Sequence, residues 1–559
     1  MPYDYDSFSR LAGPPDPPPP GDYRVRLQRL TRHRPVRSLL IVAATFTSEA
    51  TFFGWMITES GGAGTATAVL VGATALIELF RLVNVVTLCL ATLRVRDPVP
   101  VVADDRLRVA FLTTIVPGKE PIEMVEGTLR AASRIHGAPH VWLLDEGDDD
   151  QVRAMCARVG ARHFSRRGVA RWNTGRGAFK ARTKHGNYNA WVDAHGDDYD
   201  VFVSVDPDHV PLPSFGERLL GYFRDPDVAF VVGPQIYGNY DNLVTRWAES
   251  QQYLFHSLLQ RAGNRLGVPM LVGTNNAVRI EALRCVGGLQ DSITEDMATS
   301  LAIHAARNPA TGRRWRSVYT PDVLAVGEGP SSWTDYFSQQ HRWSRGTDEV
   351  CLAGFAPRIA RLGPRRALHY ALLMAYYPMT AVAWLLGTAT AVAHIVLGVR
   401  GVQVPQQVWS MLYVDAALFQ VGLYLWNRRH NVSPHEEAGS SGLTGMLLST
   451  LCAPVYVASF RQTLLRRRAG FVVTPKGDSA SPDRLATFRT HLSWAAFFAA
   501  LLVTAVLTGR THGLMWLWPA LNLALCLAPP ALWASAARPV RQVAPIPAQR
   551  TEEPVRTYA

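Results

Sequence analysis

Hydrophobic positions fall into long unbroken runs toward both ends of the chain and into shorter, regularly spaced groups in the middle. A transmembrane helix needs about 20 predominantly apolar residues, and the runs toward the ends reach that length. They occupy residues 38–58, 65–92, 368–398, 407–426, 491–509 and 513–535. The pattern predicts a transmembrane region of about six spans around one soluble domain.

The middle of the chain alternates strand and helix patterns. Apolar runs at 108–116 and 141–144 have the length of buried strands, and helix patterns follow them at 121–135 and 148–160. Such units form a mostly parallel sheet, whose ligand crevice lies at the carboxyl ends of the strands. We therefore expect an α/β domain, with Asp145 at one of these strand ends.

Composition and charge favour a membrane protein over a nucleic-acid-binding one. Of 559 residues, 48% are hydrophobic, and much of the formal net charge of +12 sits beside the apolar runs. No nucleic acid partner is expected. The first residues lack the basic region and apolar core of a signal peptide, and their proline run predicts a disordered or polyproline tail over 1–23. The six cysteines form no CxxC pair, which predicts buried, reduced thiols.

Basic residues beside the apolar runs determine the expected topology. Six arginines lie between residues 24 and 37, whereas the loop 59–64 has none. By the positive-inside rule the N-terminus is cytosolic, and two crossings return the chain to the cytosol before the soluble domain. The segment 443–463 is about long enough to cross, but basic residues such as Arg428 and Arg466 flank it on both sides. We expect it to lie at the cytosolic interface.

A pair of carboxylates ends one buried strand pattern, in VFVSVDPDHVP at 201–211. Asp206 and Asp208 are spaced by one residue, so in an extended segment they project to the same side. Together they can hold a hard divalent cation, which in turn neutralises a diphosphate. The alternative is a solvated turn.

An acidic triplet, Thr294, Glu295 and Asp296, enters the helix pattern that follows it. It could be a cap that complements the helix dipole, or it could supply a catalytic carboxylate. Further along, QQHRW at 339–343 places Gln339, Arg342 and Trp343 at helical spacing. Arginine pairs with phosphate oxygens and an indole stacks on a sugar, although an interfacial aromatic helix beside the membrane has the same composition.

In this order, these motifs resemble those of the processive family 2 glycosyltransferases, and most closely the bacterial cellulose synthase-like catalytic subunits. The similarity runs from about residue 108 to 477, between membrane spans as in that family. The matching motifs are LDEG (144–147), KHGNYNA (184–190), DPDH (206–209), TED (294–296), QQHRW (339–343) and FVVTPKG (471–477). The resemblance implies a GT-A type fold for the soluble domain.

The resemblance also implies a role for each motif. Asp145 would contact the uracil of a UDP-sugar with Lys184 nearby, and Asp206 would bind the ribose side. Asp208, with Asp206, would hold Mg²⁺ or Mn²⁺ on the diphosphate. In the TED motif (Thr294, Glu295, Asp296), Asp296 would be the general base.

Further motifs would serve the diphosphate, the acceptor and a gate. Arg342 would grip the diphosphate, and Gln339 and Trp343 would form the acceptor site. The FxVTxK pattern would make a gating loop of Phe471, Val473, Thr474 and Lys476. The chain departs from the family at Glu146, where a second Asp is usual, and it ends soon after its last span, so we expect no C-terminal cyclic-di-GMP-binding domain.

The predicted function is processive, inverting transfer from a UDP-sugar, with UDP-glucose giving a β-1,4-glucan that crosses the plasma membrane. The expected partners are the donor, the growing chain, the bilayer and polysaccharide-processing proteins outside the cell. Alternatives are another β-glycan (chitin-like, hyaluronan-like or β-1,3-linked) and transfer to a lipid carrier. A transporter that merely binds nucleotide would show ionisable residues within the spans or a Walker loop, and neither is clear in the sequence.

These expectations divide the chain into seven parts. They are a disordered tail (1–23), a basic segment with spans 1–2 (24–98), a cytosolic GT-A domain (104–345), an interface helix with spans 3–4 (346–430), a cytosolic loop with an interfacial helix and the gating loop (431–490), spans 5–6 (491–537) and a cytosolic tail (538–559).

Overall fold

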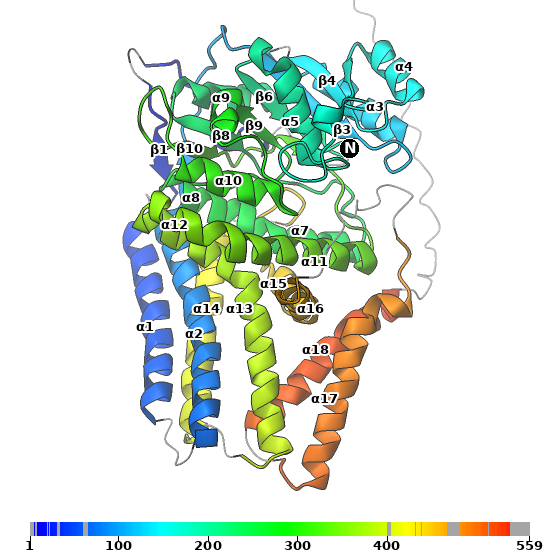
Figure 1. Cartoon of the computed structure of the whole chain (residues 1–559). Coiled ribbons are helices and arrows are strands. Elements are labelled where there is room, and N and C mark those ends of the chain that lie inside the picture. The colour runs from blue at the N-terminus through cyan, green and yellow to red at the C-terminus, as the bar shows by residue number, and fades with distance from the viewer. Residues whose placement is uncertain are drawn as a thin grey trace, which may run out of the picture.

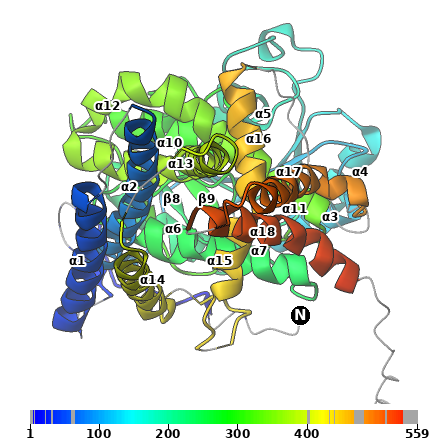
Figure 2. The same cartoon turned by 90° about the horizontal axis from the view of Figure 1, so that it is seen from below.

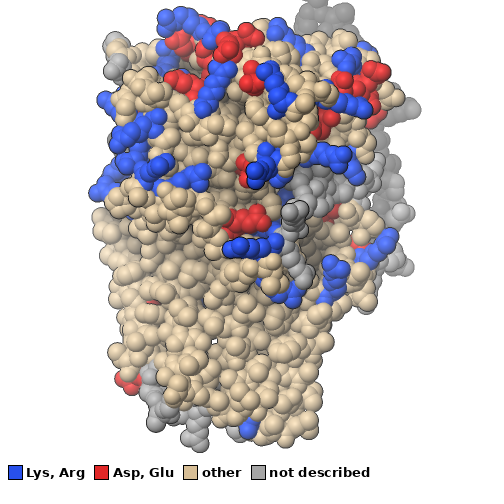
Figure 3. Space-filling model, viewed as in Figure 1, with Lys and Arg blue, Asp and Glu red and all other residues tan. Residues whose placement is uncertain are grey.

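A computed structural model places the soluble domain on top of a bundle of long helices (Figure 1). The structure describes residues 5, 8–19, 21, 23–30, 34–59, 65–137, 139–399, 404–430, 432–437, 439–466, 481–511 and 514–536. The predicted gating residues Phe471, Val473, Thr474 and Lys476 lie outside these ranges. Figure 3 shows charged side chains concentrated on the domain and almost none on the visible face of the bundle.

The domain is built on a seven-stranded sheet with the order β10-β8-β9-β6-β3-β4-β5. All neighbouring pairs are parallel except those of β9, which runs antiparallel to β6 and β8. The strands are β3 (Val109–Ile115), β4 (His140–Asp145), β5 (Arg162–Phe164), β6 (Val201–Ser204), β8 (Val228–Val232), β9 (Asn276–Arg279) and β10 (Arg316–Tyr319). The predicted mostly parallel α/β sheet is confirmed.

Helices cover both faces of the sheet, which explains why its strands are nearly continuous apolar runs. On one face pack α3 (Ile122–Ala132), α4 (Asp150–Val159) and α6 (Phe215–Leu220). On the other face pack α5 (Lys184–His195) and α10 (Glu295–Ala305). With both faces covered, the strand ends remain as the place where polar side chains can meet a ligand.

Six helices of the described chain are long and apolar enough to cross a membrane. They are α1 (Pro35–Glu59), α2 (Thr65–Arg94), α13 (Pro364–Ile395), α14 (Gln406–Arg428), α17 (Arg489–Leu507) and α18 (Leu514–Ala536). Each predicted span overlaps one of them. Several helices extend beyond the apolar run, as α1 does through Arg37, because backbone hydrogen bonding continues into the polar flanks.

A layer of shorter helices separates the sheet from the bundle. It contains α7 (Leu243–Leu254) and α11 (Trp333–Glu349), which lie across the tops of the long helices (Figure 1). Segment 443–463 forms α15 (Leu443–Leu451) and α16 (Ala453–Leu464), with a 43° bend between them. Seen from below, α15 and α16 run across the view, whereas α2 and α13 are seen nearly end-on (Figure 2).

The N-terminal segment packs against the domain, so of the two predicted alternatives for 1–23 the disordered tail is wrong for the residues that the structure describes. Tyr5 is buried, and its hydroxyl group is 2.5 Å from Nε2 of His435. The backbone N–H of Ala12 donates to Asp322 at 2.8 Å, and β1 (Leu27–Arg29) pairs with β2 (Arg96–Pro98). A proline-rich sequence can dock in extended form because it loses little conformational entropy on ordering.

Ionisable side chains occur inside the helix bundle, although the sequence showed no clear ionisable residues within the predicted spans. Arg81 on α2 donates to Glu49 on α1 at 3.1 Å and lies 3.3 Å from Glu78. Its guanidinium group also sits 4.4 Å from the ring centre of Tyr413 on α14. The charges partner one another across α1 and α2, which makes them compatible with apolar runs.

The cysteines form no disulfide, as predicted. Cys89, Cys156, Cys452 and Cys526 are buried, but Cys351 is half-buried and Cys285 is exposed, so the expectation of burial fails at these two. Cys285 follows a short helix at the domain surface, α9 (Ile280–Arg284).

Candidate active site

Acidic side chains gather where three neighbouring strands end. Asp145 is the last residue of β4, Asp206 and Asp208 follow β6, and Glu120 follows β3, which lies between them in the sheet. Because these strands are parallel, their carboxyl ends share one edge. The sequence-predicted carboxylates are therefore brought to the same side of the domain.

Lys184 begins α5 and is directed at this edge. Its ammonium group donates to a carboxylate oxygen of Asp206 and to the carbonyl oxygen of Gly273, the latter at 2.6 Å. Burial disfavours the charged lysine, but the charges of Asp206, Tyr188 and Glu295 together with the hydrogen bond to Asp206 outweigh burial and raise the pKa of Lys184. Lys184 is therefore a fixed positive charge beside the acidic pair.

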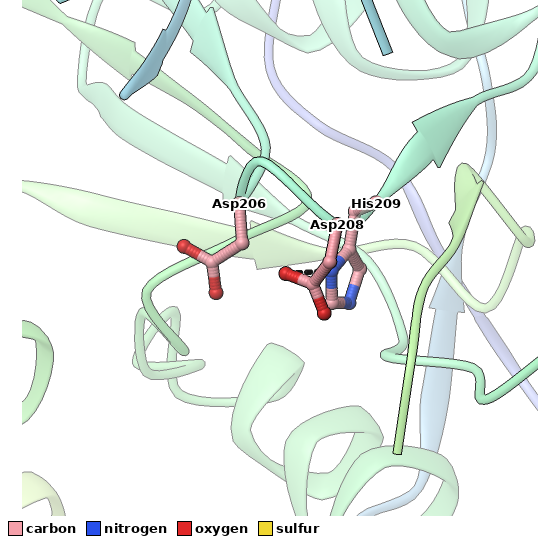
Figure 4. A group of neighbouring side chains, drawn as sticks. All are labelled: Asp206, Asp208 and His209. Carbon is pink, nitrogen blue, oxygen red and sulfur yellow. Dashed lines mark ion pairs between the residues drawn. The ribbon is translucent and has the colours of Figure 1, made fainter. Parts of the chain in front are cut away.

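Asp206, Asp208 and His209 form a group that can hold a metal ion (Figure 4). One ligand atom of each lies within 4.8 Å of the others, and Nδ1 of His209 is 3.4 Å from Asp208. That buried nitrogen makes no hydrogen bond within the described residues. Two carboxylates and an imidazole suit Mn²⁺, and carboxylates with water suit Mg²⁺, so the donor set fits the predicted ion.

Asp145 organises the loop that follows β4. Its fully buried carboxylate accepts the backbone N–H groups of Gly147 at 2.8 Å and Asp149 at 2.7 Å. Nε2 of His163 lies 3.0 Å from it. The carboxylate that was expected to meet uracil is thus engaged within the protein, and it shapes the edge of the site through the loop.

Glu146, the departure from the family pattern, has a defined structural partner. Its two oxygens accept from Nη2 and Nε of Arg166 at 2.7 and 2.9 Å. Arg166 is buried and also donates to the carbonyl oxygen of Thr183, the residue before Lys184. The longer side chain of glutamate therefore connects this loop to the start of α5.

The TED triplet lies at the start of α10. Thr294 makes no capping hydrogen bond, but Oδ1 of Asp296 accepts the backbone N–H of Met297 at 2.7 Å. Burial, and then the charge of Glu295, raises the pKa of Asp296 to about 7. A methyl group placed on Gly273 would be 3.7 Å from Oδ2 of Asp296, so this carboxylate adjoins the backbone that Lys184 binds.

The QQHRW residues approach the same place from α11. Gly346, one turn further along the helix, packs against the side chain of Thr294. Burial raises the pKa of Glu295, while the charges of Lys184 and Arg342 oppose that rise. The site therefore brings together Lys184, the TED acids and Arg342, with Gln339 and Trp343 half-buried on the same helix.

Three residues of the site were not singled out in the sequence. His209 stands inside the DPDH motif, so its position in that motif was the available signal. Burial raises the pKa of Glu120 to about 7, and the charges of Asp206 and Asp208 contribute. Tyr237 hydrogen-bonds Gln339 and had no local signal, because it lies about a hundred residues away in the sequence.

Comparison with known families identifies this arrangement. The family described as Glycosyl transferase family 2 matches residues 114–287, and Glycosyl transferase family group 2 matches residues 201–421. Residues 114–421 are therefore similar in sequence to the family 2 glycosyltransferases. The matched ranges include all the carboxylates of the site and the QQHRW helix, and the domain is a GT-A fold.

The curated relatives include cellulose synthase catalytic subunits and glucomannan mannosyltransferases. A cellulose synthase catalytic subunit of Xanthomonas axonopodis is 30% identical over 56% of this chain and 42% of its own length. A probable glucomannan 4-beta-mannosyltransferase of Arabidopsis thaliana is 31% identical over 37% of this chain and 38% of its own. The alignments thus span less than half the length of these relatives.

Solved structures show a weaker likeness. A mannosyltransferase of Pyrobaculum calidifontis, solved with GDP-mannose and Mn²⁺, aligns with 72% of this chain and 100% of its own at 16% identity and a TM-score of 0.45. The assignment therefore depends on the family matches and the geometry of the site.

Proposed function

We propose that this multi-pass membrane protein is a processive, inverting glycosyltransferase that polymerises UDP-glucose into a β-1,4-glucan and moves the product across the plasma membrane. The catalytic domain faces the cytosol in this proposal. The observation that carries it is the position of α11. One side of this helix adjoins the TED motif, and the helix also packs on α13 and α16. The site of sugar transfer and the proposed export path therefore border the same helix.

The proposed reaction is a single displacement at the anomeric carbon. The acceptor hydroxyl oxygen forms a bond to that carbon, the bond to the diphosphate oxygen breaks, and UDP leaves. Asp296 takes the hydroxyl proton, since its raised pKa makes it a competent base near neutral pH. One base opposite the leaving group gives inversion, so an α-linked donor yields a β-linked product.

Positive charge on the donor side stabilises the leaving group. Lys184 is held beside Asp206, and Arg342 approaches from α11, so both can face a diphosphate. Asp206, Asp208 and His209 would hold Mg²⁺ or Mn²⁺, which would add electrostatic stabilisation of the diphosphate. Gln339 and Trp343 are proposed to hold the acceptor sugar, and Phe471, Val473, Thr474 and Lys476 to close over the nucleotide.

A row of aromatic side chains in the bundle supports export. Tyr377 and Tyr456 have ring centres 5.0 Å apart below α11, and Trp384 on α13 contacts Trp518 on α18. The indole N–H groups of both tryptophans are buried without a hydrogen-bond partner among the described residues. Aromatic faces with spare hydrogen-bonding groups suit sugar rings, and a hydroxyl-rich chain cannot cross hydrocarbon unaided.

The glucomannan relatives favour a second candidate, synthesis of a β-1,4-mannan or mixed polymer. The decisive test is incubation of the purified protein with UDP-glucose, UDP-N-acetylglucosamine, UDP-glucuronate and GDP-mannose, with nucleotide release measured. The product is then digested with glucanases and mannanases of known linkage. Polymer from UDP-glucose that only a β-1,4-glucanase degrades supports the proposal. Nucleotide release without polymer, or polymer from another donor alone, refutes it.

A further inference from the structure

The side of α11 that faces away from the TED acids carries an unexpected polar stripe. Gly346 packs against Thr294, and residues two positions away on a helix point to nearly the opposite side. Ser344 and Asp348 occupy those positions, and Gln340 lies one turn before Ser344. The exposed fractions are 0% for Gln340 and Ser344 and 1% for Asp348, although the stripe borders the membrane-spanning helices.

The stripe has hydrogen-bonding capacity that the described part of the chain leaves unused. Nε2 of Gln340, Oγ of Ser344 and both carboxylate oxygens of Asp348 have no partner there. On α16, which packs against α11, Oγ of Ser459 is also buried without a hydrogen-bond partner among the described residues. A buried polar group without a partner costs roughly 1–3 kcal/mol, so four such side chains in one region indicate a polar ligand.

The surroundings indicate what kind of ligand fits. The hydroxyl group of Tyr456 donates to Oε1 of Gln340 at 2.9 Å, and Tyr377 lies within electrostatic range of Asp348. Aromatic rings beside unpaired donors and acceptors match a sugar, which offers apolar ring faces and hydroxyl groups at its edge. Simple hydration would account for the polar groups but would leave the rings unused.

We propose that Gln340, Ser344 and Asp348 bind the glycan as it leaves the acceptor site, and that Asp348 is a specificity-determining residue that admits uncharged sugars and excludes uronic acids. This inference builds on the proposed function. A carboxylate accepts sugar hydroxyl groups in strong charge-assisted hydrogen bonds. The same buried charge repels a uronate carboxylate, because like charges interact strongly where little water screens them.

Asp348 differs from the neighbouring Glu349 in its partners. Glu349 accepts from Nε of Arg345 at 3.0 Å, whereas Asp348 has no basic partner within the described ranges. Burial, followed by the charge of Glu349, raises the pKa of Asp348 to about 7. Glu349→Gln is therefore a matched control, since it removes an adjacent carboxylate that already has a partner.

Binding of oligosaccharides to the full-length protein in nanodiscs tests the proposal. The probes are a β-1,4-glucose hexamer and a β-1,4-glucuronate hexamer, and affinity is measured by calorimetry. We expect the wild type and Glu349→Gln to prefer the neutral hexamer by about tenfold or more, the scale of a hydrogen bond to a charged group. Asp348→Asn should bind the neutral hexamer more weakly and lose most of the preference. Ser344→Ala should weaken binding of both hexamers and keep the preference.

The outcomes separate this inference from the proposed function. An unchanged preference in Asp348→Asn, or a wild type that binds both hexamers equally, overturns the inference. If Asp348→Asn does not fold, unaltered binding of both hexamers by Ser344→Ala overturns the proposal that the polar stripe binds the glycan. A wild type that makes no polymer from any donor yet binds the neutral hexamer selectively overturns the proposed function and leaves the inference standing.

Discussion

The ammonium group of Lys184 is held in place by the carboxylate of Asp206 at the edge of the sheet. The lysine also binds the carbonyl oxygen of Gly273, so it has little freedom to move. A nucleotide diphosphate arriving at this edge meets a positive charge that is already positioned. Such preorganised charge costs no rearrangement during the reaction.

The first prediction concerns the loss of the positive charge at Lys184. Lys184→Met should lower the rate of UDP release by roughly 10²-fold, the scale for loss of one electrostatic contact to a leaving group. Lys180→Met is the control, because Lys180 pairs with Asp291 at the surface and is 42% exposed. Equal rates in the two variants would show that Lys184 does not stabilise the leaving group.

The second prediction concerns the metal group. Asp208→Asn should abolish synthesis, and chelation with EDTA should silence the wild type until Mg²⁺ or Mn²⁺ is restored. Asp200→Asn, at a surface pair with Arg108, should synthesise normally. Binding of Mn²⁺ can be followed by electron paramagnetic resonance without any reaction. Full activity in EDTA would refute a metal role.

The third prediction concerns the general base. Asp296→Asn should lose polymer synthesis by about 10²-fold or more yet bind UDP nearly as the wild type does. Because asparagine keeps an Oδ1 that can accept the N–H of Met297, the variant should remain folded. A carboxylate with its pKa raised to about 7 is protonated below that pH, so the wild-type rate should fall as the pH drops through 7. Substantial polymer from Asp296→Asn would refute its role as the base.

The structure also shows how far the sequence predicts the protein. The spans, the parallel sheet and the carboxyl-end acids followed from periodicity and motifs, because such patterns are local. Glu146 could not be interpreted, since its partner Arg166 is 20 residues away and carries no motif. The tail was mispredicted for the same reason: the partners of Tyr5 and Ala12, His435 and Asp322, are hundreds of residues distant.

The fourth prediction concerns the charges within the bundle. Arg81→Gln leaves Glu49 and Glu78 without their cation, and we expect it to lower the thermal unfolding temperature in detergent strongly. Removing one partner of a buried pair costs about 3–5 kcal/mol. Glu78→Gln should be milder, because Arg81 keeps its hydrogen bond to Glu49. Unfolding temperatures equal to that of the wild type in both variants would mean that the pairing contributes no stability.

The fifth prediction concerns topology. Single cysteines placed at Gly439 and Pro482 in a cysteine-free background should react with an impermeant maleimide only from the cytosolic side. These positions flank α15 and α16, which lie crosswise to the long helices. A cysteine at Thr511, in the loop between α17 and α18, should react only from outside. Outside labelling at Pro482 alone would mean that α15 and α16 cross the membrane.

The contact between Tyr5 and His435 also sets an order of events during synthesis. Tyr5 is made 430 residues before its partner, which follows the helix α14. The segment around Tyr5 therefore cannot take its final position until residue 435 has been translated. A nascent chain that stops before residue 435 lacks the partner of Tyr5. Formation of this contact therefore marks a chain in which the fourth long helix, α14, has been made.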